Sequence, residues 1–242
     1  MNFIKHIIEF KKLNLVWQSE NDSNHLRYVV AELIKNESGI QLRYLNASED
    51  FKKAVSFGFV GYPAFSVEIE LHNNRVLEAF QRRLPPRGRE DFGKYLEMFR
   101  LPKNSEISDF SLLGYSGAKL PGDEFSIIPS FQEIEQPYEF LIEVTGFRHH
   151  SPIPIGEIAL DSLVAFEAEP ENNIDPNAIK ILIQGKKIGY VTRPLLNDFH
   201  NWLSDNRIER AFVEKKNGQP DRPTLYIFVE LKAKVSTKRI MV

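Results

Sequence analysis

Cysteine is absent from this chain of 242 residues. Without thiols the protein can form no disulfide, no thiolate metal site and no cysteine nucleophile, and this composition suits a reducing cytosol. No apolar run approaches the roughly 18 residues that a membrane-spanning helix needs. The first 17 residues are interrupted by lysine, histidine and glutamate, so they lack the continuous apolar core of a signal peptide. We therefore expect a cytoplasmic protein with no membrane partner.

A large excess of positive charge is also missing, because the net charge is -2. The part before Tyr138 has 17 basic and 19 acidic residues, and the part from Tyr138 onward has 14 of each. Proteins that coat duplex DNA gain affinity by neutralising many phosphates. We therefore do not expect this protein to coat duplex DNA, whereas a small local nucleic-acid pocket is still allowed.

The common signatures of catalysis are missing as well. The segment 114–120 contains glycines and a lysine, but it lacks the spacing of a phosphate-binding loop and the Ser or Thr that follows the lysine there. His149 and His150 are adjacent, so in a strand their side chains point to opposite faces and cannot easily bind one metal. Asp175 has no second carboxylate or histidine fixed near it by the sequence. We expect no enzyme activity, no cofactor and no metal.

What is present indicates an α+β fold. The apolar fraction of 42% and the charged fraction of 26% are typical of a soluble globular protein. The first 130 residues predict a sheet with helices packed on it. Apolar spacing and capping residues place the strands at 13–18, 25–34, 40–45 and 125–129, and the helices at 49–57, 76–84, 89–99 and 109–115.

The second half predicts mostly strands. The stretch 129–138 is polar with proline near each end, so we place a linker at 131–138 between a domain at 1–130 and a domain at 139–242. Short strands at regular spacing with one or two helices predict a small β-barrel. The strands are expected at 139–147, 162–169, 177–184, 187–191, 208–215 and 224–232, and a helix at 194–205.

A segment rich in aromatic residues and glycine, FGFVGYPAF, occupies residues 57–65 of the first half. One interpretation is a loop packed on the sheet, where large aromatic residues are most often buried. The other is an exposed surface that contacts a partner protein. The residues of that surface would be Phe57, Phe59, Tyr62 and Phe65.

Residues 138–232 resemble the HIRAN family in three turn segments that follow one another in the family's order. The first is Gly146-Phe147-Arg148, and the last is Gly189-Tyr190-Val191. Between them lies Glu169-Pro170 followed by Asn172, Asp175 and Asn177-Ala178-Ile179. The family fold is a small β-barrel with accessory helices, and its best understood members capture the free 3′ end of single-stranded DNA.

The resemblance implies a role for individual residues of this chain. Arg148 would lie near the phosphates, His149 at a base-stacking position, Asn172 would be a polar contact, and Asp175 would hold the terminal hydroxyl. His150 and Tyr190 complete the expected DNA-binding set. Two positions differ from those DNA binders, because His149 stands where they have tyrosine and Ile174 where they have an aromatic residue. The alternative is that Asp175 and Asn177 only brace a turn and that the barrel binds protein.

Residues 13–129 resemble the N-terminal subdomain of HipA-like serine/threonine kinases. The residues that carry the resemblance are Phe80 with Leu84-Pro85, Ser108-Asp109-Phe110 with Leu112-Leu113, Gly117, and the closing Phe125 with Ile127-Ile128-Pro129. The kinase body that follows in that family is missing here. Some bacterial toxin–antitoxin operons encode this subdomain separately from the kinase, which it then binds and restrains.

Two functions follow from these resemblances. The first is a non-catalytic, antitoxin-like subunit that binds a HipA-type kinase through the segment 57–65. The second is an accessory factor that binds single-stranded DNA 3′ ends in repair, replication or phage defence. The two are compatible, because each uses a different half of the chain.

Overall fold

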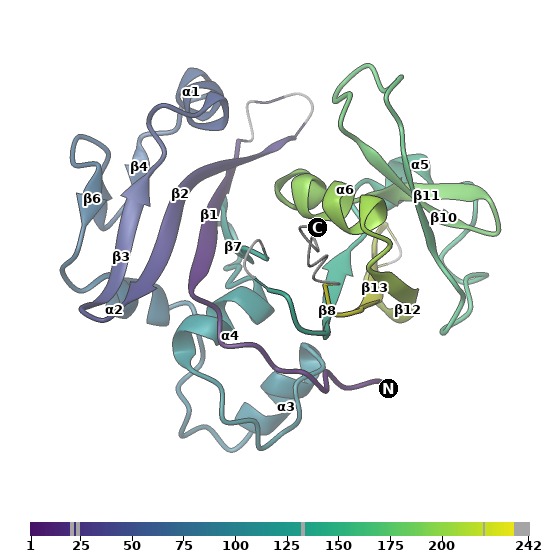
Figure 1. The fold of residues 1–242 in the computed structure, drawn as a ribbon, viewed down its shortest axis with the longest axis horizontal. Helices are drawn as coiled ribbons and strands as arrows, with labels where there is room; N and C mark the ends of the chain where they lie inside the picture. Colours follow the sequence, from purple (N-terminus) through teal and green to yellow (C-terminus); the bar gives the residue numbers. More distant parts are fainter. Residues whose placement is uncertain (20–21, 23–24, 132–133, 220, 235–242) are drawn as a thin grey trace, which may run out of the picture. The chain divides into compact units, whose positions relative to one another are not determined.

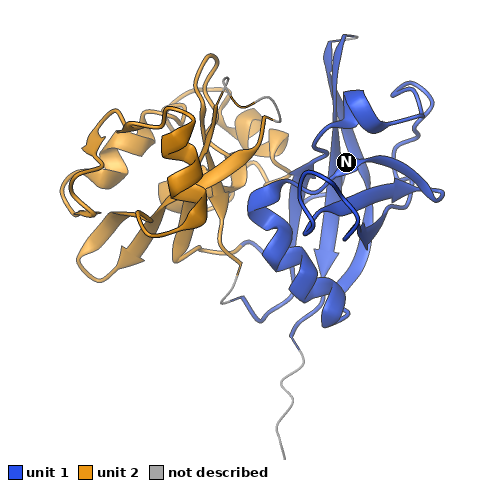
Figure 2. Ribbon diagram, turned by 90° about the horizontal axis from the view of Figure 1, so that it is seen from above, with its two compact units in different colours: residues 1–7, 132–242 blue, residues 8–131 orange. Residues whose placement is uncertain are grey.

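The computed structural model describes residues 1–19, 22, 25–131, 134–219 and 221–234. It divides into two compact units, drawn in different colours in Figure 2: residues 8–131, and residues 1–7 together with 132–242. The first seven residues thus pack with the second half of the chain, which the sequence alone does not indicate. No helix among the described residues has the length and apolar character that crossing a bilayer requires.

The unit of residues 8–131 is built on an antiparallel sheet with the order β6-β3-β2-β1-β7 (Figure 1). One face of the sheet meets the core, so residues of β1 alternate between half-buried and buried at its start; Leu13 and Leu15 of this strand are fully buried. The bounds are β1 Lys12–Gln18, β2 Arg27–Asn36, β3 Gly39–Tyr44, β6 Leu71–His72 and β7 Phe125–Pro129.

Four helices accompany this sheet, and two of them begin at the serine caps that the sequence predicts. The hydroxyl of Ser48 accepts a hydrogen bond from the Phe51 amide, and that of Ser108 accepts one from the Ser111 amide, each at 3.1 Å. The helices are α1 Glu49–Ser56, α2 Val76–Gln81, α3 Phe92–Met98 and α4 Asp109–Ser116, and a two-residue hairpin is formed by β4 Gly61–Tyr62 and β5 Phe65–Ser66.

The aromatic segment 57–65 is packed inside this unit. Phe59, Tyr62 and Phe65 are all buried, and the ring of Tyr62 stacks on that of Phe80 with the centroids 4.5 Å apart. Phe57 is half-buried and stacks on Tyr28. The expectation of an exposed aromatic contact surface at these four residues is therefore wrong, because the rings gain more from leaving water together than from solvent exposure.

The unit of residues 1–7 and 132–242 holds two antiparallel sheets of three strands. One has the order β12-β13-β8 and the other β11-β10-β9. The bounds are β8 Tyr138–Glu143, β9 Ala165–Ala168, β10 Ile179–Ile183, β11 Lys186–Tyr190, β12 Ile208–Gln219 and β13 Arg222–Leu231. The helical elements are α5 Phe147–His150, the 3₁₀ turn η1 Arg193–Leu195 and α6 Leu196–Ser204.

The predicted barrel is not confirmed, because neither sheet closes on itself within the described residues. Isolated bridges instead join the two sheets, one between Thr145 and Tyr190 and one between Leu163 and Phe212. The strand expected at 139–147 ends at Glu143, and the last four of those residues leave it; they include the bridge at Thr145 and the start of α5 at Phe147. The strands expected at 208–215 and 224–232 are also longer than predicted, because residues 216–219 and 222–223 pair as well, with Gln219 opposite Arg222.

Helix α6 covers the core of this unit with the apolar face that its sequence predicts (Figure 1). Phe199 and Trp202 are buried, and both pack against Phe140 of β8. Because these residues recur at a spacing of three along the helix, their side chains lie on one face. The helix is thereby packed on β8.

The first seven residues form an N-terminal strap on the same unit. The backbone and the side-chain amide of Asn2 donate to Glu214 at 3.1 and 2.7 Å. The amides of Lys5 and His6 donate to Glu139 Oε2 at 3.1 and 3.0 Å, and His6 Nδ1 lies 2.9 Å from Oε1. Ile4, between them, is buried. The strap therefore supplies donors to two carboxylates that are almost completely buried.

Candidate functional site

The segment between β9 and β10 is shaped by Asn172. Its Oδ1 accepts hydrogen bonds from the amides of Ile174 and Asp175, each at 3.0 Å. Its Nδ2 donates to Glu169 Oε2 at 2.7 Å and to the hydroxyl of Tyr190 at 3.2 Å. Asparagine side chains often bond the backbone two or three residues on in this way, which fixes the turn. The loop from 169 to 178 is thus tied to β11.

Glu169 lies directly after β9 and accepts from three donors. Besides Asn172 they are the Tyr190 hydroxyl at 2.7 Å and Lys187 Nζ at 3.2 Å. Burial by itself raises the pKa of Glu169, but the hydrogen bonds from Asn172, Tyr190 and Lys187 outweigh it and lower the pKa to about 2. The carboxylate is therefore ionised at neutral pH, and Lys187, which also donates to the Tyr190 hydroxyl at 2.7 Å, has a raised pKa.

Asp175 sits at the end of this loop with its side chain about one-fifth exposed. Its Oδ1 accepts from the amide of Asn177 at 3.0 Å, and its Oδ2 lies 3.5 Å from Nε of Arg193. An ionised carboxylate offers about four acceptor positions, so these two contacts leave room for a further donor. Ile174 beside it is 59% exposed, so most of its surface is open to solvent.

The N-cap of helix α5 is Gly146, which has φ +71° and ψ 14°. Glycine adopts this left-handed conformation without strain, and a Cβ there would lie 2.7 Å from Cδ2 of His150. The ring of His150 meets the edge of Tyr190 with the centroids 5.0 Å apart. Desolvation, followed by the charges of Lys187 and His149, lowers the pKa of His150. Arg148 and His149 are exposed on α5, with Arg148 Nη2 3.0 Å from His149 Nε2.

The structure brings the predicted DNA-binding residues into one chain of contacts. His150 touches Tyr190, Tyr190 touches Asn172, and Asn172 holds the amide of Asp175. Arg148 and His149 belong to the same short helix as His150. We refer to this group as the α5–loop site.

Sequence reasoning missed three charged members of this site: Glu169 as a carboxylate that accepts from several groups, Lys187 and Arg193. Lys187 and Tyr190 are three residues apart, which in a regular strand places them on opposite faces. The pairing of β10 and β11 shifts between Ile181 and Leu182, where Gly189 and Lys187 are the successive partners. This irregularity turns both side chains to the same side. No pattern in the sequence predicts the irregularity.

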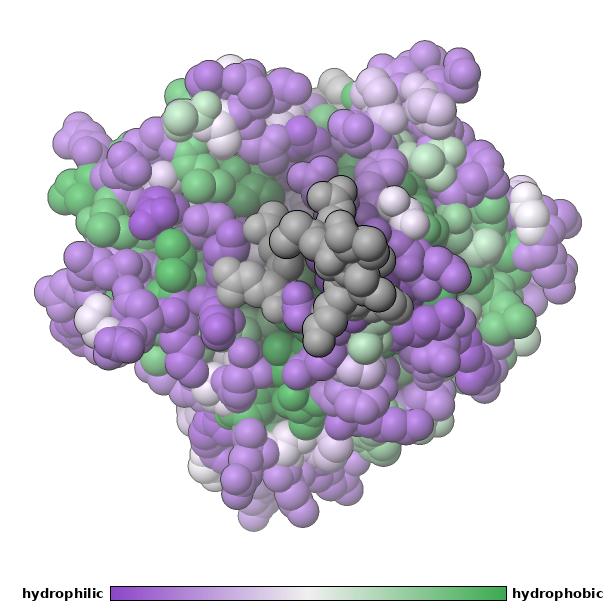
Figure 3. Space-filling model, viewed as in Figure 1, coloured by the Kyte–Doolittle hydropathy of each residue, from purple (hydrophilic) through white to green (hydrophobic). Residues whose placement is uncertain are grey.

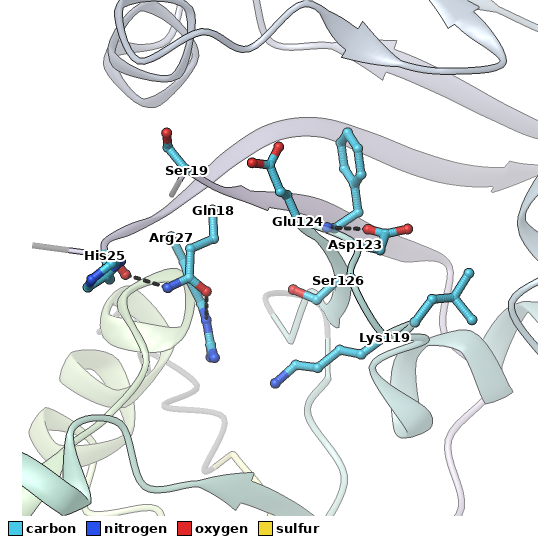
Figure 4. A pocket seen from close by; sticks show the side chains of 11 residues that line it. Gln18, Ser19, His25, Arg27, Lys119, Asp123, Glu124 and Ser126 are labelled. Carbon is cyan, nitrogen blue, oxygen red and sulfur yellow. Dashed lines mark hydrogen bonds between the residues drawn. The ribbon is translucent and has the colours of Figure 1, made fainter. Parts of the chain in front are cut away.

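The unit of residues 8–131 has a surface pocket of about 450 Å³ (Figure 4). Gln18 links its polar wall by donating to the His25 carbonyl at 2.8 Å and accepting from Arg27 Nε at 3.4 Å. Lys119 and Leu120 of the segment 114–120 also line it, but Gly114 is inside α4 and Gly117 is its C-cap.

Among the described residues no group of three metal-binding side chains occurs. On the face drawn in Figure 3, hydrophobic residues lie in separate areas among hydrophilic ones.

The comparisons with known proteins concern the second half of the chain. Residues 137–235 match the HIRAN domain, so a HIRAN domain is present there. The crystal structure of the HIRAN domain of human HLTF aligns with 40% of this chain and 76% of its own, at 19% identity and a TM-score of 0.33. No curated protein matches the chain. The resemblance of residues 13–129 to HipA-like kinases finds no support, and the kinase partner stays a prediction from the sequence.

Proposed function

We propose that this protein is a non-catalytic binding module that captures the 3′ end of single-stranded DNA at the α5–loop site. The HIRAN domain at residues 137–235 makes this ligand the leading candidate. The observation that carries the proposal is the arrangement of exposed Arg148 and His149 beside a loop that presents a half-buried, partly unsatisfied carboxylate at Asp175. This combination offers a cation, a ring and a hydrogen-bond acceptor to one strand end.

Each group has a distinct task in this proposal. The guanidinium of Arg148 pairs with a backbone phosphate, and the imidazole of His149 stacks on a base without regard to sequence. Asp175 accepts a hydrogen bond from the terminal 3′ hydroxyl. A terminal 3′ phosphate offers no such donor at neutral pH and brings negative charge against the carboxylate, so it is rejected. The site therefore reads the chemistry of the end and not the base sequence.

The test compares two 12-nucleotide strands, one with a 3′ hydroxyl and one with a 3′ phosphate, each labelled at the 5′ end. Fluorescence anisotropy with the full chain is expected to show at least about tenfold tighter binding of the hydroxyl strand, since hydrogen bonds to charged groups contribute about 1.5–3 kcal/mol. Asp175→Ala should remove the difference. Equal affinity of the native protein for both strands, or no binding, contradicts the proposal.

A further inference from the structure

Asn172, which the HIRAN resemblance makes a DNA contact, has no free hydrogen-bonding position. A carboxamide has two N–H donors and two acceptor positions on its oxygen. Both donors are used, by Glu169 and by Tyr190, and both acceptor positions are used, by the amides of Ile174 and Asp175. A direct contact from this side chain to DNA would require one of these four bonds to break.

The Tyr190 hydroxyl is occupied in the same way. It donates to Glu169 Oε2 at 2.7 Å and accepts from Lys187 Nζ and Asn172 Nδ2 at 2.7 and 3.2 Å. A phenolic hydroxyl has one donor and two acceptor positions, so none remains. Two of the six expected contact residues are thus committed to the protein's own structure.

Both residues converge on Glu169, whose carboxylate is the shared acceptor of the network. Its place is rigid because the Glu169 amide donates to the Ala178 carbonyl at 2.8 Å, across the base of the loop. The carboxylate draws the Nδ2 end of Asn172 toward itself, which leaves Oδ1 facing the amides of Ile174 and Asp175. Without this charged acceptor the carboxamide is free to rotate and those amides lose their partner.

We infer that Glu169 is the positioning residue of the α5–loop site and that Asn172 transmits its effect to Asp175 without touching DNA. The inference deepens the proposed function and rests on it only for the DNA ligand; the geometry of the loop is independent of any ligand. Hydrogen bonds to a charged acceptor are stronger than neutral ones. The bonds to Glu169 therefore stabilise this network more than the bond from any single backbone amide.

The first experiment is carried out on the free protein. Amide hydrogen exchange is measured by NMR for Ile174 and Asp175 in the native chain and in Glu169→Ala. Exchange at both amides is expected to be at least about tenfold faster in the variant, since local opening follows the loss of the bonds that close the loop. Glu167→Ala is the matched control, because Glu167 lies two residues away and pairs with Lys180 on the sheet and not with Asn172.

Unchanged exchange at these two amides in a folded Glu169→Ala protein overturns the inference. If that variant does not fold, Asn172→Ala is measured instead, and the same acceleration is expected because it removes the acceptor itself. Slow exchange in Asn172→Ala would show that the amides are protected by something else, which also overturns the inference.

The second experiment tests the link to DNA with the two 12-nucleotide strands. Glu169→Ala is expected to reduce the preference for the 3′ hydroxyl strand to within about twofold of unity, as Asp175→Ala does. The double variant Glu169→Ala/Asp175→Ala should bind the 3′ hydroxyl strand no more weakly than either single variant, because both substitutions act through Asp175. Full additivity contradicts the inference. If the native protein has no end preference the proposed function fails, while the exchange experiment still decides the role of Glu169.

Discussion

At the residue scale, the exposed side chains of α5 carry the electrostatic part of the proposed site. Replacing Arg148 with alanine removes one phosphate contact from a single strand. The dissociation constant should rise about three- to tenfold, and the slope of log K against log salt should fall by about 0.7. Anisotropy titrations at several salt concentrations measure both.

Arg222→Ala is the control for the loss of one positive charge, because Arg222 is exposed on the β12–β13 hairpin. If both variants lose the same affinity and the same salt slope, binding depends on net charge and not on a contact by Arg148.

Gly189, which precedes Tyr190 of the site, is required by the close approach of β11 to the segment after β8. Its φ is +151°, and a Cβ would lie 2.5 Å from Val144 Cγ1 and 2.6 Å from the Thr145 carbonyl oxygen. Gly189→Ala should destabilise the protein by about 2–4 kcal/mol, measured by urea unfolding, because the backbone must move to admit the methyl group.

Gly185→Ala provides the matched comparison, since a Cβ there meets no atom within 4 Å although φ is +75°. Only the conformational strain of about 1 kcal/mol is expected at that position. A loss at Gly189 no larger than at Gly185 would show that the close approach is not what requires glycine.

The roles of the site residues were harder to predict than their places. The resemblance names Arg148, Asn172, Asp175 and Tyr190, and the structure brings them together. The resemblance cannot reveal that every hydrogen-bonding position of the Asn172 and Tyr190 side chains is occupied. That depends on Lys187 and Glu169 meeting across a strand irregularity. The hydrogen-bond partners of a side chain are known only from the three-dimensional structure, whereas the residue types at turns can be read from the sequence.

At the element scale, the loop from 169 to 178 is a local structure held by one ionised carboxylate. The folded-state pKa of Glu169 is about 2 and its ordinary value is 4.5, so the unfolded chain takes up the proton first as the pH falls. The stabilisation is complete above pH 4.5 and is lost between pH 4.5 and about 2. After allowance for solvent screening we expect a contribution of about 1–2 kcal/mol.

Urea unfolding at pH values from 6 to 2.5 measures this effect as the difference between the native protein and Glu169→Gln. The amide cannot be protonated in this range, so the variant should lack this part of the acid destabilisation, and the two stability curves should converge as the pH falls. Parallel curves would show that the hydrogen bonds do not depend on the charge of Glu169.

Element types were predicted well where a local cause acts alone. Ser48 and Ser108 begin helices because their hydroxyls cap free amides, and α6 follows from apolar residues on one face. Prediction failed where distant segments decide. The sequence leaves two interpretations of the segment 57–65, a packed loop and an exposed surface; the structure supports the packed loop, because its rings contact Phe80 and Phe125 from later in the chain. The strand predicted at 139–147 is too long, because the chain leaves β8 after Glu143 and the left-handed Gly146 caps the start of α5.

At the scale of the whole molecule, the compact units do not coincide with two continuous halves. In the sequence, residues 8–131 separate the N-terminal strap from the rest of the unit to which that strap belongs. The matched HIRAN domain starts at residue 137, so the strap is an addition outside the matched segment. Its anchor, Glu139, is only 8% exposed, and a buried carboxylate without donors is costly.

Deleting residues 1–7 should therefore destabilise this unit by about 2–4 kcal/mol, because Ile4 loses its burial and Glu139 loses the donors from Lys5 and His6. Hydrogen exchange is expected to accelerate in β8, β12 and β13 and to stay unchanged in β2 and β3 of the other unit. Lys5→Ala is the control, since its side chain is exposed and its backbone amide still donates to Glu139. Equal protection of β8 in the deleted and native chains would show that residues 137–235 are stable without the strap, and that residues 1–7 only rest on their surface.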